Sequence, residues 1–239
     1  MNRDPSSDNR HCLLVDTAAA RCAAAIYDMQ AMQIVSSVDS LVGKGHAELL
    51  LDQVAEALAG AGIVMQDLSR IGVTVGPGSF TGLRVGISAA RGLALALDIA
   101  VVGVGTLEAL AFPWLRQGGP VLAVQDARRG EVFAALYDAD GDELAPASAL
   151  SPAAAAALAP RDGRLLHVAG SGAELLAPLI AGGFAQLHDY EGLPQMAAIG
   201  AIAATRQPGE AVRPLYLRGA DAKPQAPVAG IVRLGLPSA

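Results

Sequence analysis

A glycine-rich loop is the segment of this chain whose residue types come nearest to a ligand site. Residues 76–82 (GPGSFTG) lie between a β-rich run and an apolar helical run. Ser79 and Thr81 can cap the helix that begins near Phe80, and free N–H groups at such a helix start can hold an anion. The loop lacks the Lys-Ser/Thr pair of a P-loop, and Thr81 replaces the third Gly of a dinucleotide fingerprint. The spacing favours a tight strand-to-helix connection, with an anion site as the alternative.

A carboxylate followed by a hydroxyl closes the first predicted strand, at Asp16 and Thr17. In actin-like and sugar-kinase-like folds, an acidic residue at this place holds metal-bound water near the phosphates of a nucleotide. A turn aspartate is equally a common strand terminator. We expect the structural role, and a vestigial nucleotide or anion site made by Asp16, Thr17, Gly78 and Ser79 remains the alternative.

Patterns for other chemistry are missing from the sequence. The four histidines are isolated from one another in sequence, and no H-x₃-H, H-E-x-x-H, C-x-x-C or G-x-S-x-G spacing occurs. We therefore predict no catalytic residue, no metal ligand and no cofactor. Cys12 and Cys22 are expected to be buried free thiols.

A charged turn, Asp126 to Val132 (DARRGEV), separates two predicted strands. A solvated hairpin accounts for it, and contact of Arg128 and Arg129 with a complex or with tRNA is the sharper alternative. The net charge of −6 and the aromatic content of 4% argue against nucleic-acid binding by the chain alone.

The run at 83–97 (LRVGISAARGLALAL) predicts a helix that is apolar on nearly every side. Such a helix must be covered on more than one face. Small residues at four-residue spacing, Gly82, Gly86 and Ala90, would let another backbone approach closely. One face can pack on the sheet, and the element that covers the other face belongs either to this chain or to a partner. The amphipathic helix at 46–61 could extend a surface that binds a partner.

The order of elements predicts an α/β fold. A three-strand meander (12–38) precedes helix 46–61, and strands and helices then alternate to residue 115, which implies a mixed sheet flanked by helices. After a break at 117–120, a new hairpin and Ala-rich helices follow. Residues 1–10 and 219–239 are expected to be disordered extensions. Neither an export signal nor a membrane span is expected, so the chain is predicted to be cytoplasmic.

Five segments together resemble the TsaB (YeaZ) family across residues 12 to 218. They are LLVDT (13–17), HAELL (46–50), GPGSFTGLRVG (76–86) with ARGL (90–93), DARRGEV (126–132) and PLYLR (214–218).

The resemblance implies a two-lobed actin-like (ASKHA) fold with mixed sheets flanked by helices. It implies a non-catalytic subunit of the complex that adds threonylcarbamoyl to adenosine 37 of tRNAs reading ANN codons. The metal, the nucleotide and the transfer belong to a TsaD-like partner, and a TsaE-like ATPase joins them. The subunit pairs with itself when alone and meets tRNA only through the complex. An independent ATP-binding phosphotransferase or metallopeptidase of the same superfamily stays the alternative.

The resemblance also places the partner surface and the lobes. The first lobe is expected at 11–106 with about 207–218, and the second at 107–206. The expected partner contacts are His46, Leu49, Leu50, Gln53, Val54, Phe80, Thr81, Gly82, Val85, Gly86, Ala89 and Ala90.

Overall fold

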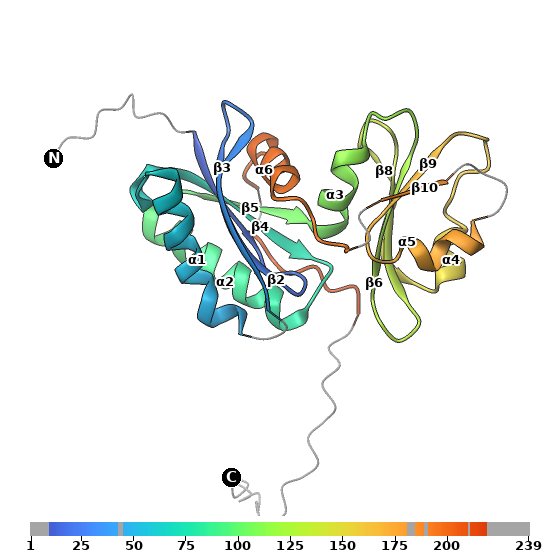
Figure 1. The fold of residues 1–239 in the computed structure, drawn as a ribbon, viewed down its shortest axis with the longest axis horizontal. Helices are drawn as coiled ribbons and strands as arrows, with labels where there is room; N and C mark the ends of the chain where they lie inside the picture. The colour runs from blue at the N-terminus through green and yellow to red at the C-terminus, as the bar shows by residue number, and fades with distance from the viewer. Residues whose placement is uncertain (1–9, 43–44, 181–184, 189–190, 210, 219–239) are drawn as a thin grey trace, which may run out of the picture.

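Two five-stranded sheets lie side by side, each flanked by helices (Figure 1). This computed structural model describes residues 10–42, 45–180, 185–188, 191–209 and 211–218. The first sheet has the order β3-β2-β1-β4-β5, and the second has the order β10-β9-β6-β7-β8. Both sheets contain parallel and antiparallel pairs. The predicted two-lobed fold of mixed sheets and covering helices is confirmed. The predicted terminal extensions fall almost entirely outside the described residues.

The first sheet begins with the predicted meander. β1 (His11–Asp16), β2 (Arg21–Asp28) and β3 (Gln33–Leu41) pair antiparallel. β4 (Leu68–Gly76) and β5 (Ala100–Gly105) then add in parallel. The carboxyl ends of β1, β4 and β5 therefore meet at one edge of the sheet, where Asp16 and the glycine-rich loop lie.

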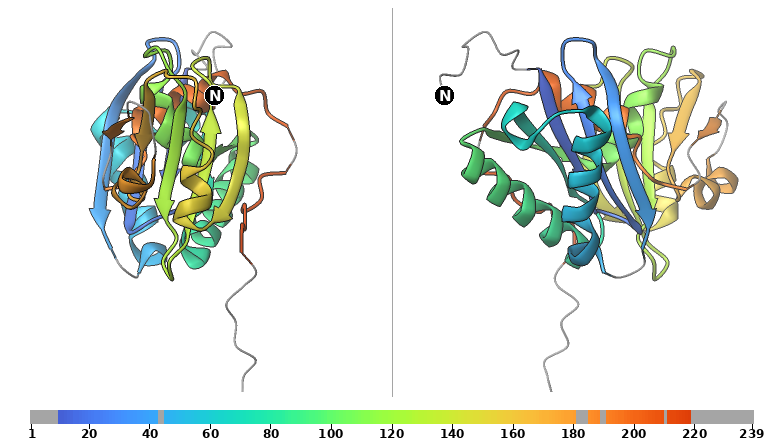
Figure 2. Two further views of the ribbon diagram at one scale, coloured as in Figure 1. Left: turned by 90° about the vertical axis from the view of Figure 1, so that its right-hand side faces the viewer. Right: turned by 60° about the vertical axis from the view of Figure 1, so that its left-hand side comes forward.

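Helices cover both faces of this sheet. α1 (His46–Ala61) and α2 (Phe80–Leu97) pack on one face, and α6 (Met196–Thr205) packs on the other (Figures 1 and 2). Leu13 joins the core under α1 and α2, whereas its neighbour Leu14 joins the core under α6. Successive side chains of a strand point to opposite faces, so a strand buried on both sides must be apolar throughout.

The position of α6 corrects one predicted lobe boundary. The expected second lobe, 107–206, includes residues 195–206. Ile199 and Ala203 are instead buried against the first sheet, in the cluster that contains Leu14 and Tyr27. The chain therefore returns to the first lobe before α6. The remaining lobe boundaries stay predictions.

The second sheet contains the predicted hairpin. β6 (Val121–Asp126) and β7 (Val132–Tyr137) pair antiparallel, and β8 (Glu143–Leu150) continues from β7. β9 (Leu166–Ala169) runs parallel to β6, with β10 (Ala185–His188) at the outer edge. The edge strands β8 and β10 were not predicted, since both are short of buried apolar residues.

Short helices cover the second sheet. α4 (Pro152–Ala156) and α5 (Ala173–Leu176) lie on one face, and α3 (Thr106–Ala111) lies on the other. The sequence predicts helices near 151–159 and 173–181, and the α-helices that form there are shorter. Single 3₁₀ turns occur at Met65–Asp67, Phe112–Trp114 and Ala177–Leu179.

Candidate functional site

Asp16, at the end of β1, is a fully buried carboxylate whose two oxygens both have partners inside the chain. Its Oδ2 accepts a hydrogen bond from Arg21 Nη2 at 2.7 Å. Its Oδ1 accepts from Thr74 Oγ1 at 2.8 Å and from the Ala18 N–H at 3.1 Å. Arg21 Nη2 also donates to the Pro194 carbonyl, on the segment that enters α6. The charge of Asp16 is therefore balanced within the first lobe.

The glycine-rich loop is closed by the turn that follows β1. The Ser79 N–H donates to the Ala18 carbonyl at 2.7 Å, and Thr17 Oγ1 donates to the Gly82 carbonyl at 2.7 Å. Ser79 caps α2 as predicted, because its Oγ accepts from the Gly82 N–H at 3.2 Å. A Cβ at Gly78 or Gly82 would collide with the backbone carbonyl oxygens of residues 17 and 18. The glycines thus serve close packing of two chain segments at this place.

The small-residue face of α2 is occupied by the chain itself. A side chain at Gly86 would collide with Thr17 and press on Val15, and Ala90 is fully buried. Gly82 and Gly86 do admit a second backbone, as their spacing suggested. That backbone is β1 and its turn.

The predicted partner contacts therefore differ in accessibility. Residues buried inside the chain are His46, Leu50, Gln53, Val54, Gly82, Gly86 and Ala90. Half-buried ones are Leu49, Val85 and Ala89, and only Phe80 and Thr81 are exposed. His46 is held by its Nε2, 3.1 Å from the Ala19 carbonyl.

The outward faces of α1 and α2 carry two exposed leucines that sequence reasoning missed. Leu51 is 58% exposed and Leu95 is 85% exposed. The two helices contact one another, and each carries one of these leucines on its exposed side. Small apolar residues lie beside them, among them Ala55 and Ala96. The helical period of 3.6 places Leu95 opposite the buried Gly86, but a helix sequence that is apolar on nearly every side does not show which side faces outward.

The turn of the β6–β7 hairpin presents arginines. The side chains of Arg128 and Arg129 are exposed, and both residues have left-handed backbones, with φ of 63° and 57°. Arg218 Nη1 reaches across and donates to the Ala127 carbonyl at 2.8 Å. The residues of the predicted vestigial site and this hairpin thus sit on separate elements.

Comparison with known proteins identifies the family. A family model described as "TsaD: tRNA N6-adenosine threonylcarbamoyltransferase" matches residues 35–181. An uncharacterized protein of Mycobacterium tuberculosis is 36% identical over 90% of this chain and 94% of its own length. TsaB of Escherichia coli is 37% identical over 54% of this chain and 55% of its own length. YeaZ from Pseudomonas aeruginosa superposes with a TM-score of 0.72 at 27% identity, covering 87% of this chain and all of that one. The chain belongs to the TsaB (YeaZ) family.

Membership of the TsaB family confirms the predicted actin-like fold. The family model that matches the chain carries the name of TsaD, and the named relatives are TsaB proteins. The relatives from Escherichia coli and Bacillus subtilis are both named tRNA threonylcarbamoyladenosine biosynthesis protein TsaB. The parts aligned with the E. coli and Bacillus subtilis TsaB proteins span about half of each, at 55% and 45%.

In this TsaB-family chain, α2 is long and apolar enough to cross a membrane when judged by length and composition alone. Its buried face contributes Leu83 and Ile87 to the core of the first sheet. Its exposed face carries Arg84 and Arg91. This amphipathic arrangement is that of a helix covering a sheet.

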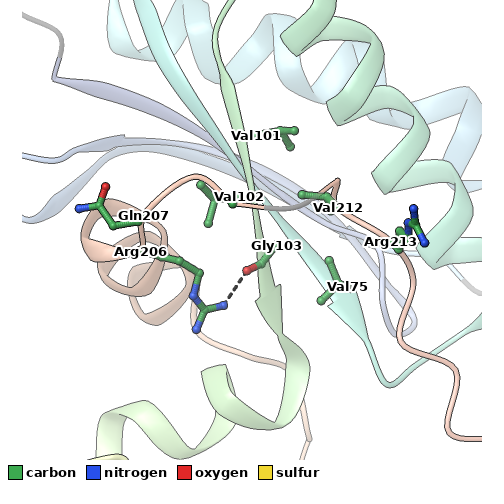
Figure 3. Close-up of a pocket in the computed structure, with 9 residues that line it drawn as sticks. Val75, Val101, Val102, Gly103, Arg206, Gln207, Val212 and Arg213 are labelled. Atoms are coloured by element: carbon green, nitrogen blue, oxygen red, sulfur yellow. Dashed lines mark hydrogen bonds between the residues drawn. The ribbon is translucent and has the colours of Figure 1, made fainter.

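Two pockets lie away from Asp16. One, of about 240 Å³, lies beside β5, where Arg206 Nη1 donates to the Gly103 carbonyl at 2.6 Å, and valines line much of it (Figure 3). The other, of about 270 Å³, lies between the lobes and is lined by Glu108, Glu143 and Tyr137. Burial, followed by the two carboxylates, raises the pKa of the Tyr137 hydroxyl. Neither pocket is lined by a residue of the predicted vestigial site.

The structure also joins two histidines that are 21 residues apart in sequence. His167 Nδ1 lies 3.1 Å from His188 Nε2 on neighbouring strands, and Trp114 stacks on His188 at 3.5 Å between ring centroids. Within the described part of the chain, no group of three or more His, Cys, Asp or Glu side chains comes together. No sequence spacing could have found this pair, because it depends on the parallel register of β9 and β10.

Proposed function

We propose that this chain is a non-catalytic partner subunit of the complex that adds threonylcarbamoyl to adenosine 37 of tRNAs reading ANN codons. It binds and supports a TsaD-like catalytic subunit in the cytoplasm. The observation that carries the proposal is the exposure of two leucines, Leu51 on α1 and Leu95 on α2. Exposed leucines on adjacent helices are costly in water and are typical of protein contact surfaces.

The non-catalytic role is supported by the hydrogen bonds that the Asp16 carboxylate makes within the chain. A carboxylate that holds metal-bound water needs a free lone pair directed at the ligand. Arg21, Thr74 and the Ala18 N–H instead engage both oxygens of Asp16. The adjoining loop is closed against Thr17 and Ala18. The transfer chemistry would then belong to the partner.

The same surface accounts for the other proposed partners. An apolar face that is complementary to a related subunit can also pair with a second copy, so we propose a homodimer when the chain is alone. A TsaE-like ATPase would join the assembled pair, and tRNA would be met only within it.

Leu95→Arg and Leu51→Arg test the partner surface. Both side chains are exposed, so the fold should be retained, and we expect affinity for the TsaD-like subunit to fall by about tenfold or more. Leu144→Arg is the matched control, because Leu144 is 54% exposed on β8 of the other lobe. Calorimetric titration measures all three. Normal binding by both helix variants would overturn the proposed surface. Leu50 and Gly86 are unsuitable positions, since each is buried within the chain.

Titration of the isolated chain with Mg-ATP tests the enzymatic alternative. No heat of binding is expected, because both oxygens of Asp16 are already engaged by groups of the chain itself. Micromolar binding accompanied by turnover would favour an independent ATP-binding enzyme and contradict the non-catalytic proposal.

A further inference from the structure

The pocket of about 270 Å³ between the two lobes contains a tyrosine hydroxyl without a hydrogen-bond partner among the described residues. Tyr137, at the end of β7, lines this pocket and is only 7% exposed. Tyrosine hydroxyls that are buried to this extent usually find a hydrogen-bond partner. The hydroxyl of Tyr137 is therefore available to a ligand in the pocket.

Two carboxylates line the same pocket. Glu143 is directly opposite Tyr137 in the β7–β8 ladder, and Glu108 lies in the first turn of α3. The Glu108 carboxylate already has a counter-charge, because Arg206 pairs with its Oε1 and the Gly105 N–H donates to its Oε2 at 3.3 Å. Glu143 makes no ion pair or hydrogen bond with the residues that the structure describes. The lining thus has two carboxylates and one guanidinium group, so one negative charge is left without a partner.

Both carboxylates act on the Tyr137 hydroxyl. Burial is the main cause that raises the pKa of Tyr137, and the charges of Glu108 and Glu143 raise this pKa further. The hydroxyl is therefore neutral at physiological pH, and its oxygen keeps lone pairs that can accept a hydrogen bond. The phenol oxygen and the Glu143 carboxylate are acceptors on neighbouring strands that face one space.

The other walls of the pocket are apolar and come from both lobes. Pro77 follows β4 of the first lobe, and Ala147 belongs to β8 of the second lobe. Leu215 adds a third wall from the segment 211–218. A water molecule occupies about 30 Å³ of the liquid, so the pocket has room for a ligand several times that size. Apolar walls with a few convergent polar groups suit a ligand that has a hydrocarbon part.

We propose that this pocket binds a small organic cation, whose primary ammonium group is held by the Glu143 carboxylate and the Tyr137 oxygen. An ammonium group has three N–H donors and no acceptor, so it matches these two acceptors. The unpaired negative charge disfavours phosphates and carboxylates as ligands. A divalent metal ion fits less well, because it needs more oxygen ligands than the lining offers and Glu108 is already paired with Arg206.

Butylammonium is the probe, because it combines one ammonium group with a short alkyl chain. Ligand-observed NMR titration of the full chain should give a Kd of about 1 mM for this probe. Butanol has the same chain without the charge, and it should bind about tenfold more weakly or less. Equal binding of butanol and butylammonium would overturn the assignment of a cation. So would a lack of butylammonium binding at about 20 mM.

Glu143→Gln and Tyr137→Phe locate the site. Glu143 is exposed on its outer side, so the fold should be retained, and the affinity for butylammonium should fall about tenfold. Tyr137→Phe keeps the buried ring and removes only the hydroxyl, and the affinity should fall about 3- to 10-fold. Asp142→Asn is the matched control, because it removes the same charge from an exposed neighbour that does not line the pocket.

The control decides whether the pocket or the general charge of the hairpin attracts the probe. Weaker binding by the two pocket variants, with unchanged binding by Asp142→Asn, supports the inference. Equal losses in Glu143→Gln and Asp142→Asn overturn it, and so does unchanged binding in Glu143→Gln. If Tyr137→Phe lowers the melting temperature so far that the chain unfolds, the comparison of the other two variants is sufficient.

The same titration in the presence of the TsaD-like subunit separates a free amine from a side chain of that subunit. Probe binding that is retained by the complex supports a small ligand. Displacement of the probe would overturn the assignment to a small ligand, because the partner would then fill the pocket. The inference does not rest on the proposed function: if no complex forms, the proposed function fails, and the titrations of the isolated chain still decide.

Discussion

Asp16 and Arg21 form the ion pair on which the end of β1 depends. The Asp16 carboxylate is fully buried, and the Arg21 side chain is 11% exposed. Removing two charges from water is costly, and the cost is recovered only while both partners remain. Arg21 also binds the Pro194 carbonyl, so it ties the first hairpin to the segment before α6.

Arg21→Met should therefore destabilise the fold by about 3–5 kcal/mol, because it leaves Asp16 buried without a counter-charge. Urea unfolding measures the loss. Adding Asp16→Asn should restore part of it, since the amide carries no charge. Arg164→Met, which breaks an exposed pair with Asp162, should leave the urea midpoint unchanged. Equal effects of Arg21→Met and Arg164→Met would contradict the role given to Arg21.

The two cysteines should be unreactive in the folded protein. Burial raises the pKa of the Cys12 thiol to about 12 and that of Cys22 to about 11, from an ordinary value of 9.0. Both thiols then stay neutral at pH 8, and an aromatic disulfide reagent should modify neither until the chain unfolds. The raised pKa values also predict that stability present below pH 9.0 is lost as the pH rises toward 11–12. Rapid native-state modification would contradict this.

The sequence indicates which single residues matter, but it does not indicate which residues most of them contact. Ser79 was predicted to cap α2 and does so. Asp16 was expected as a strand terminator, but its pairing with Arg21 depends on closure of the β1–β2 hairpin, which no spacing rule specifies. The same limit applies to Gly86: its small size predicted a close backbone, and only the fold shows that this backbone lies near Thr17.

At the scale of elements, α2 carries glycines with opposite roles. Gly82 lies against the backbone of residue 17, whereas Gly92 is exposed and has open space where a Cβ would be. Elements with a strong pattern were predicted closely: α1 begins and ends as predicted at 46 and 61. β8 was missed because Pro146 and its half-exposed residues give no alternation to read.

Gly82→Ala and Gly92→Ala should change stability in opposite directions. The first forces two backbone segments apart and should cost about 1–3 kcal/mol or more, as overpacking does. The second should stabilise α2 by about 0.5–1 kcal/mol, because alanine loses less conformational entropy in a helix than glycine. Thermal unfolding of the two variants measures both changes. A loss of stability in Gly92→Ala would show that this face of α2 is covered even in the isolated chain.

At the scale of the whole molecule, residues 211–218 connect the two lobes. The Leu215 N–H donates to the Val75 carbonyl at 2.7 Å, which fixes the segment to β4 of the first sheet. The Tyr216 ring lies 5.0 Å from the Phe80 ring at the start of α2. Arg218 then donates a hydrogen bond to the Ala127 carbonyl of the β6–β7 hairpin in the second lobe. Residues 211–218 thus contact both α2 and the β6–β7 hairpin. The PLYLR motif alone does not predict these contacts.

Arg218→Gln should release the β6–β7 hairpin while leaving the rest of the fold intact. Losing these charged hydrogen bonds should cost the local structure about 1–2 kcal/mol, which raises the population of an open hairpin about 5- to 30-fold. Trypsin cleaves after arginine, so cutting after Arg128 or Arg129 should accelerate by a similar factor when the hairpin opens and closes faster than trypsin cleaves. Arg213→Gln is the matched control, because Arg213 lies in the same segment and makes no hydrogen bond or ion pair with the other described residues. Equal cleavage rates in the two variants would mean that the turn holds its strained backbone without Arg218, and the coupling between the lobes would then end at Tyr216.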